Sequence, residues 1–275
     1  MSLADMPPLR DALERHDLLA RKSFGQHFLL DLNITRKIAR LAGIGPDDVV
    51  VEVGPGPGGL TRALLETGAR VVAIEMDSRF LPILADLTEA SDQRLEVVQG
   101  DALKVDAFKA VGEVPAHVVA NLPYNVGTQL LINWLTGPFL PLSMTLMFQK
   151  EVAERIAAQV DDDAYGRLAV ISQTVCEAKI VMDLPARAFT PPPKVASAVV
   201  HVVPRPDRPD AATLKKLERV TAAAFGQRRK MLRSSLKQLG GGALCEASGI
   251  DPDARAETVD VAGFLRLANA LENKA

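Results

Sequence analysis

Four consecutive residues, Asn121-Leu122-Pro123-Tyr124, combine an amide, a proline and an aromatic ring directly after an apolar, strand-like run at 116–120. In open α/β sheets, ligands bind outside the carboxyl ends of the strands. The side-chain carbonyl of Asn121, with the backbone carbonyl of Leu122 or Pro123, can accept hydrogen bonds from an amine, and the ring of Tyr124 can stack on a planar base. The stretch therefore predicts a site for an exocyclic amine. A tight turn around a buried tyrosine is the alternative.

A glycine-rich loop at 54–59 follows a second apolar, strand-like run at 48–53. Glycines 54, 56 and 58 allow a tight turn and a close approach of the backbone to a ligand at a helix N-terminus. Gly54, Gly56 and Gly59 also satisfy the G-x-G-x-x-G pattern of dinucleotide-binding dehydrogenases, with an acidic residue, Glu75, about 20 residues further on. The loop alone thus fits either a dehydrogenase or a methyltransferase that uses S-adenosylmethionine, and both would use Glu75 to bind ribose hydroxyls.

Three features favour the methyltransferase. Glu52 precedes the glycines, Pro57 stiffens a loop that has no pyrophosphate to wrap, and Asp101 follows the third strand, where it can accept from an adenine amino group. The fourth strand ends in the Asn121 stretch, which is unsuited to hydride transfer. An adenine amine is a poor nucleophile, so the sulfonium must supply reactivity while the protein positions the amine. No metal is predicted, because the two cysteines and four histidines lack ligand spacing.

The elements that must position these residues alternate between strand and helix up to residue 150, which predicts a parallel, doubly wound sheet. A helix capped by Asn33 and ended by Gly43 comes before the first of these strands. Strand-like runs at 176–182 and 198–203 predict an antiparallel edge. After a proline-rich linker the chain is helical in character. We therefore expect an α/β, Rossmann-like catalytic domain at 1–205 that binds S-adenosylmethionine, and a small all-helical domain at 206–275 that contacts RNA.

Charge is distributed unevenly along the chain. Residues 205–240 hold ten Lys or Arg against three acids, a balance of +7, so a net charge of −2 leaves −9 for the rest. This asymmetry favours a polyanionic partner. Arg229, Arg233 and Lys237 are predicted to lie on one helical face. The predicted RNA-binding residues are Lys194, Arg228, Arg229, Lys230, Arg233 and Lys237, with a solvated charged surface as the alternative.

The bulk properties favour a cytoplasmic protein. Hydrophobic residues make up 48% of the chain, yet no apolar run reaches the ~18 residues that a membrane-spanning helix needs. The acidic residues within 1–20 argue against a targeting peptide. The two cysteines, far apart and without a Cys-x-x-Cys motif, fit a reducing compartment.

Five stretches, at 21–29, 52–58, 121–124, 189–195 and 224–232, occur in the order seen in ribosomal RNA adenine dimethyltransferases. The chain resembles the bacterial KsgA (RsmA) type over about residues 20 to 237. The resemblance implies N6-dimethylation of two adjacent adenines in a hairpin near the 3′ end of 16S rRNA, within the small ribosomal subunit (pre-30S) during its assembly. We expect a monomer, since no self-association stripe is evident.

The resemblance also implies roles for individual residues. The catalytic residues would be Asn121, Pro123, Tyr124 and Phe189, and the cofactor contacts His27, Leu29, Gly54, Gly56, Glu75, Asp101 and Asn121. Phe189 would sandwich the base opposite Tyr124; the alternative is a core phenylalanine before a polyproline turn. His27 departs from the asparagine usual in the family. Two other functions remain open: a large-subunit rRNA methyltransferase of the antibiotic-resistance type, and a ribosome assembly factor whose methylation is secondary.

Overall fold

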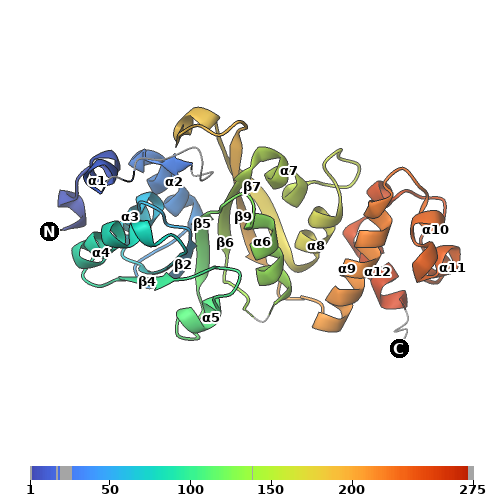
Figure 1. Ribbon diagram of the computed structural model, residues 1–275. Coiled ribbons are helices and arrows are strands. Elements are labelled where there is room, and N and C mark those ends of the chain that lie inside the picture. The colour runs from blue at the N-terminus through green and yellow to red at the C-terminus, as the bar shows by residue number, and fades with distance from the viewer. Residues whose placement is uncertain (1, 17, 19–26, 138, 272–275) are drawn as a thin grey trace. The chain divides into compact units, whose positions relative to one another are not determined.

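The computed structural model describes residues 2–16, 18, 27–137 and 139–271 (Figure 1). The chain divides into two compact units. The first unit comprises Met1–Trp134, Pro138–Ala153 and Lys179–Val203, and the second comprises Leu135–Gly137, Glu154–Ala178 and Pro204–Ala275. The functional division predicted at residue 205 stays a prediction.

A seven-stranded sheet in the order β4-β3-β2-β5-β6-β9-β7 forms the core of the fold. Its strands are β2 (Val49–Val53), β3 (Arg70–Glu75), β4 (Leu95–Gln99), β5 (His117–Asn121), β6 (Met144–Gln149), β7 (Cys176–Leu184) and β9 (Ser197–Pro204). The pairs β2·β3, β3·β4, β2·β5 and β5·β6 are parallel, and β9 runs antiparallel to β6. The predicted Rossmann-like sheet with an antiparallel edge is confirmed.

Both faces of the central strands are buried, which explains their continuous apolar sequences. On one face, Val50, Val71 and Val119 belong to a core cluster shared with α2 (Leu32–Ala42), α3 (Gly59–Glu66) and α4 (Leu81–Ala90). The alternate residues, such as Val51 and Val72, are equally inaccessible on the other face. The remaining helical segments of this region are η3 (Ser78–Phe80), α5 (Ala107–Ala110), α6 (Gly127–Thr136), α7 (Lys150–Ala157) and η4 (Ala186–Ala188).

The cap of α2 differs from the prediction. Asp31 caps the helix, because its side chain accepts a hydrogen bond from the backbone N–H of Asn33 at 2.8 Å. Asn33 lies inside the first turn, so its predicted capping role is wrong. Gly43 ends the helix in the left-handed region at φ 71°, as the sequence predicts.

A two-stranded sheet that the sequence analysis missed joins distant parts of the chain. β1 (Phe28–Leu29) pairs antiparallel with β8 (Phe189–Thr190). Leu29 lies opposite Phe189, and Phe28 opposite Thr190. Strands this short carry no readable periodicity, so only the folded chain reveals that these segments lie together.

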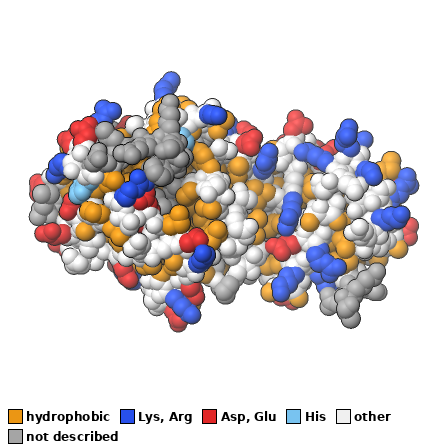
Figure 2. Space-filling model, viewed as in Figure 1, with side chains coloured by type: hydrophobic (Ala, Val, Ile, Leu, Met, Phe, Trp, Pro, Cys, Tyr) orange, Lys and Arg blue, Asp and Glu red, His pale blue; other side chains and the backbone are white. Residues whose placement is uncertain are grey.

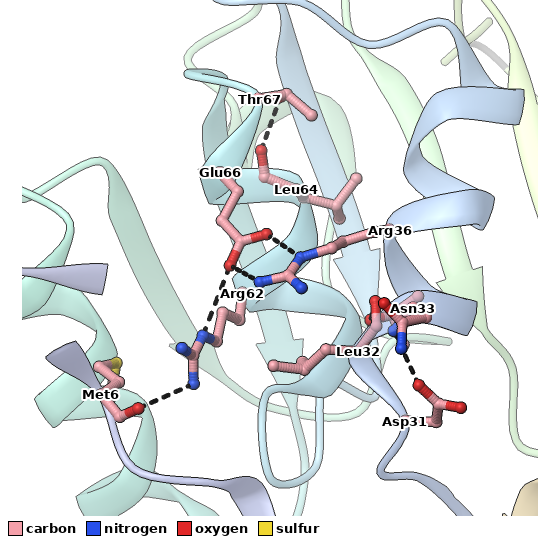
Figure 3. A network of polar contacts seen from close by, with 10 residues as sticks. Met6, Asp31, Leu32, Asn33, Arg36, Arg62, Leu64, Glu66 and Thr67 are labelled. Atoms are coloured by element: carbon pink, nitrogen blue, oxygen red, sulfur yellow. Dashed lines mark hydrogen bonds and ion pairs between the residues drawn. The ribbon is translucent and has the colours of Figure 1, made fainter. Parts of the chain in front are cut away.

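The N-terminal segment, with η1 (Leu3–Asp5) and α1 (Leu9–Arg15), is held to α3 by Arg62. The guanidinium of Arg62 donates to the backbone carbonyls of Met6 and Pro7, and its Nε lies 3.6 Å from Glu66 Oε1 (Figure 3). Glu66 also accepts from Arg36 Nε and Nη2, at 2.6 and 2.9 Å. One carboxylate on α3 thus binds two arginines beside the N-terminal segment.

The second unit is mainly helical. Its helices include α8 (Arg167–Val175), α9 (Ala211–Gly226), α10 (Leu232–Ser235), η5 (Lys237–Leu239), α11 (Gly241–Ala247), η6 (Ala256–Thr258) and α12 (Val261–Ala270). The ring of Phe225 contacts the rings of Tyr165 and Phe264, and the Tyr165 hydroxyl donates to the carbonyl of Val259 at 3.0 Å. Aromatic packing around Phe225 therefore fixes the C-terminal end of α9.

The basic segment at 225–237, which begins at the end of α9, is not one helix. The backbone N–H groups of Leu232 and Arg233 donate to the carbonyls of Ala254 and Pro252, at 2.8 and 2.9 Å. These donors are bound to another segment instead of to the preceding turn, so the chain changes direction between α9 and α10. The prediction that Arg229, Arg233 and Lys237 share one helical face is therefore wrong.

Candidate active site

A cavity of about 610 Å³ lies in the first unit at the carboxyl ends of β2, β3, β4 and β5. Its walls come from the segments that follow these strands, and from the residues at the start of β1. Eight residues predicted for the catalytic and cofactor sites line it: His27, Gly54, Gly56, Glu75, Asp101, Asn121, Pro123 and Tyr124. The structure thus brings together residues that are up to 97 positions apart along the chain.

The glycine loop approaches its neighbours too closely for side chains. Gly58 adopts φ 83°, and a Cβ there would clash with Leu87 Cδ1. A Cβ on Gly59 would lie 2.6 Å from the carbonyl oxygen of Leu29. Glycine is required at these two positions because α3 begins directly beneath β1 and beside α4. Gly54 and Gly56 of the same loop line the cavity.

Glu75 ends β3 with a carboxylate held by the backbone. Its Oε2 accepts from the N–H of Gly56 at 3.0 Å, and its Oε1 from the N–H of Asp77 at 2.7 Å. Only 6% of the residue is exposed. Burial raises the pKa of Glu75, and these backbone hydrogen bonds act in the opposite direction. Each oxygen retains a lone pair for a further donor, such as a ribose hydroxyl.

Asn121 ends β5, and one hydrogen bond sets the direction of its amide. Nδ2 donates to the backbone carbonyl of His27 at 3.4 Å. A carbonyl can only accept, so this contact assigns the nitrogen to His27 and leaves Oδ1 as the acceptor. Because Asn121 also lines the cavity, the side chain is arranged to accept from a ligand donor.

Tyr124 is anchored at its hydroxyl, which is 2.8 Å from Ser197 Oγ on β9. Burial raises the pKa of Tyr124, so the phenol is neutral at physiological pH. Its ring lies over that of His27, with centroids 6.1 Å apart and planes inclined by 28°. His27 Nδ1 in turn donates to the carbonyl of Pro191 at 2.8 Å. The ring nitrogen that faces this carbonyl must therefore carry the proton.

The sequence comparisons place the whole chain in a family. The profile described as "Ribosomal RNA adenine dimethylase" matches residues 18–273. This chain belongs to the ribosomal RNA adenine dimethylase family. A relative from Caulobacter vibrioides, "Ribosomal RNA small subunit methyltransferase A", is 77% identical over 92% of this chain and 97% of its own. A relative of the same description from Phenylobacterium zucineum is 66% identical over 98% of this chain and 94% of its own.

Two solved structures of RNA-modifying enzymes have a fold similar to that of this chain. A dimethyladenosine transferase from Plasmodium falciparum superposes with a TM-score of 0.73 at 27% identity, covering 88% of this chain and 96% of the other. The 23S rRNA methyltransferase ErmE gives 0.69 at 26% identity, covering 89% and 99%. The likeness extends both to a dimethyladenosine transferase and to a 23S rRNA methyltransferase, so the fold alone does not identify the RNA.

Two residues predicted for the dimethylase site do not line the cavity. Phe189 is 3% exposed and belongs to the hydrophobic core of the first unit, as does Leu29, its partner across β1 and β8. The placement of Phe189 agrees with the alternative of a core phenylalanine before the polyproline turn. Its role in sandwiching a base stays a prediction, as does the cofactor contact of Leu29. Lys194 is exposed.

Glu52 was predicted only as the residue that precedes the glycines of the loop, and its burial was not anticipated. It is 1% exposed within β2. Burial raises the pKa of its carboxyl to about 8; Thr61 lowers it, and the carboxylate of Glu75 raises it further. A charged residue type within the run Val-Val-Val-Glu-Val is the signal that could have revealed it, because an acid in a strand buried on both faces needs a specific environment.

The predicted RNA-binding residues of the second unit fall into two groups. Arg228 Nε lies 2.8 Å from Glu257 Oε2, and Arg233 Nη1 lies 2.6 Å from Asp253 Oδ1. Arg229, Lys230 and Lys237 are exposed, and no ion pair is found for them among the described residues. Lys and Arg side chains are prominent over the C-terminal helices in Figure 2.

Neither a metal site nor a membrane span is found in the parts of the chain that the structure describes. Among the described residues, no group of three or more His, Cys, Asp or Glu is arranged to hold a metal ion. None of the described helices is long and apolar enough to cross a membrane. Cys176 and Cys245 are both free and buried.

Proposed function

We propose that this chain uses S-adenosylmethionine to dimethylate the N6 amino groups of two adjacent adenines in a 16S rRNA hairpin of the assembling small subunit. The Asn121 amide carries the proposal. Its nitrogen donates to the carbonyl of His27, so its oxygen is the available acceptor at a cavity on the carboxyl edge of the sheet. The reaction is proposed to take place in the cytoplasm, with the protein acting as a monomer.

The cavity fits the cofactor in size and in its donor and acceptor groups. Its volume of about 610 Å³ lies within the range of small-molecule sites. Glu75 would bind the ribose hydroxyls, Asp101 the adenine amino group, and the backbone around Gly54 and Gly56 would lie against the methionine part. Bound S-adenosylmethionine supplies an electrophilic methyl group on its sulfonium.

Asn121 would then prepare the substrate amine. The lone pair of an adenine N6 is delocalised into the ring, and a hydrogen bond from N6–H to Oδ1 favours a pyramidal nitrogen whose lone pair faces the methyl group. A second acceptor is needed for the other hydrogen of an unmethylated amine. The Pro123 carbonyl already accepts from the N–H groups of Val126 and Gly127, so we assign this role to Leu122. After the first transfer, the one remaining hydrogen still has Asn121 as its acceptor.

Tyr124 would hold the base itself. Its ring, fixed through the hydroxyl by Ser197, offers a face for stacking. Stacking requires that the adenine leave its neighbours, which suits a hairpin loop better than a duplex. Arg229, Lys230 and Lys237 would contact phosphates, because their charges are not neutralised by an ion pair among the described residues.

Sequence identity favours the small subunit over the large one. The relatives described as small-subunit methyltransferases are 77% and 66% identical to this chain, whereas ErmE is 26% identical. A role as an assembly factor is compatible with the same surfaces, and it becomes the second candidate if binding to immature subunits survives loss of catalysis.

One assay tests the proposed function. The protein and radiolabelled S-adenosylmethionine are incubated with immature small subunits, mature small subunits and large subunits, and the digested RNA is analysed for N6,N6-dimethyladenosine. We expect this product from immature small subunits, and none with Asn121→Ala. Labelled product on large-subunit RNA, or a methylated guanine or cytosine, would overturn the proposal.

A further inference from the structure

Glu52 and Asn121 project from the same face of neighbouring strands. β2 and β5 are paired in parallel. Val50 of β2 and Val119 of β5 belong to one core cluster, and Glu52 and Asn121 each lie two residues further along. Side chains two apart in a strand share a face. Val50 lies opposite His117, so Glu52 lies opposite Val119, and Asn121 is its diagonal neighbour on the same face.

A small cavity connects the two side chains. It has a volume of about 30 Å³ and is lined by both Glu52 and Asn121, with residues of the glycine loop and of β1 completing its walls. A space of this size, with polar neighbours, has room for a single water molecule. Glu52 Oε2 has no hydrogen-bond partner among the described residues, and at 1% exposure it cannot reach bulk solvent.

The hydrogen bond that restrains Asn121 is weak. It joins the amide to the His27 carbonyl over 3.4 Å, against about 2.9–3.0 Å for an ordinary N–H···O bond. An amide held by one long bond can turn about its last torsion, which would replace the acceptor oxygen by the nitrogen. A second restraint from within the protein would prevent this rotation.

We propose that Glu52 is a positioning residue for Asn121, acting as a neutral carboxylic acid through a water molecule in the small cavity between them. This inference rests on the proposed function of Asn121. A protonated carboxyl both donates and accepts, so it can order a water that in turn orients the amide. An ionised carboxylate only accepts, so the water would have to donate to it, and the direction of the water's hydrogen bond to the amide would change.

The surroundings of Glu52 favour its neutral form. Burial and the negative charge of Glu75 on β3 raise the pKa of Glu52, and they outweigh hydrogen bonding to Thr61 on α3, which lowers it. No cation is found against Glu52 in the part of the chain that the structure describes. Burial raises the pKa of this carboxyl to about 8, so the acid is mostly neutral at pH 7.

Two variants separate positioning from a purely structural role. Glu52→Gln keeps a neutral donor and acceptor of the same size, and Glu52→Leu removes both. We expect Glu52→Leu to lower the single-turnover rate of methyl transfer about tenfold or more, as displaced catalytic groups do, with a much smaller change in cofactor Kd. Glu52→Gln should restore most of that rate. Wild type should lose rate as pH rises through about 8, and the glutamine variant should not.

A second measurement keeps the inference separate from the proposed function. The side-chain amide resonances of Asn121, followed by NMR in the protein with cofactor and without RNA, should shift with pH through about 8 in wild type and stay constant in Glu52→Gln. Constant resonances in wild type, or the same alkaline loss of rate in Glu52→Gln, would overturn the positioning role. Missing dimethyladenosine in wild type, with the resonances still titrating, would overturn the function of the site and not the link between the two residues. Should Glu52→Leu fail to fold, the glutamine variant alone decides.

Discussion

The side-chain nitrogen of Asn121 lies 3.4 Å from the backbone carbonyl oxygen of His27, 94 residues earlier in the chain. His27 is held by Pro191 and lies over Tyr124, whose hydroxyl is bonded to Ser197. These contacts connect the chain around the end of β5 to the start of β1, to the segment before β9 and to β9 itself. The groups that would hold a base are therefore fixed to the sheet and to one another before any ligand binds.

Replacing Asn121 by alanine should remove catalysis and leave the fold intact. We expect the rate of methyl transfer to fall by about 10²-fold or more, since misplacement of a reacting group carries a penalty of this size. The side chain is held by one long hydrogen bond to the His27 carbonyl, so the thermal unfolding midpoint should change little. Single-turnover kinetics and thermal melts check both parts. A variant that retains the wild-type rate would reduce the Asn121 stretch to a turn.

Two substitutions of Tyr124 distinguish the stacking role of its ring from the anchoring role of its hydroxyl. Tyr124→Ala should lower kcat/KM for RNA strongly, because a stacked base contributes roughly 1–3 kcal/mol. Tyr124→Phe keeps the ring and removes only the hydroxyl that contacts Ser197, so its effect on kcat/KM should be much smaller. Ser197→Ala is the matched control and should behave like Tyr124→Phe. Equal decreases in Tyr124→Phe and Tyr124→Ala would show that the hydroxyl, and not the ring, matters.

Glu75 predicts how cofactor affinity depends on pH. Burial raises the pKa of Glu75 above its usual 4.5, so its protonation begins at a higher pH than for an exposed glutamate. A protonated carboxyl has less acceptor capacity for the ribose hydroxyls, and cofactor affinity should fall as pH is lowered towards 5. Calorimetric titration from pH 8 to about pH 5 measures this. Glu75→Gln should bind more weakly at pH 8 and show a flat profile, whereas the exposed control Glu96→Gln should follow wild type.

Much of the fold and site could be predicted, because the signals are local. The runs Val49–Val53 and His117–Asn121 are apolar and end in glycine or Asn-Leu-Pro-Tyr, and parallel strands deliver such ends to one edge of the sheet. The pairing of β1 with β8 could not be predicted, because two-residue strands have no periodicity. It is this pairing that places Phe189 opposite Leu29 and in the core.

The basic segment shows why local charge and helix periodicity mislead. Its residues suit a continuous helix, but the N–H groups of Leu232 and Arg233 bond to Ala254 and Pro252. Tertiary partners from about 20 residues away thus override the local preference. The acids that neutralise Arg228 and Arg233 come from the same distant segment, so no inspection of 225–237 alone could divide its cations into paired and unpaired groups.

This division makes a prediction about RNA binding. Neutralising Arg229, Lys230 and Lys237 to glutamine should weaken binding to small-subunit RNA and reduce the salt slope by about 0.7 to 0.9 for each phosphate interaction that is removed. Cofactor affinity should be unchanged. Arg228→Gln with Arg233→Gln is the matched control, which should lower the unfolding midpoint and change the salt slope less. Binding isotherms at several salt concentrations decide, and an unchanged slope in the triple variant would exclude this surface.

Through its ion pairs beside the N-terminal segment, Glu66 makes the free energy of unfolding depend on pH. Hydrogen bonding to Arg36 lowers the pKa of Glu66, so its stabilising effect is present above the ordinary value near 4.5 and is lost as pH falls through the lowered value. Glu66→Gln should decrease the free energy of unfolding at pH 7 by about 1 kcal/mol, the upper end for a partly exposed ion pair, since the buried Arg62 also depends on this carboxylate. Urea denaturation at pH 7 and below about pH 4 should show the difference shrinking in acid. Glu89→Gln, a substitution at an exposed position on α4, is the control and should leave the free energy of unfolding unchanged at either pH. If Glu66→Gln decreased the free energy of unfolding equally at both pH values, the ionic contribution would be ruled out.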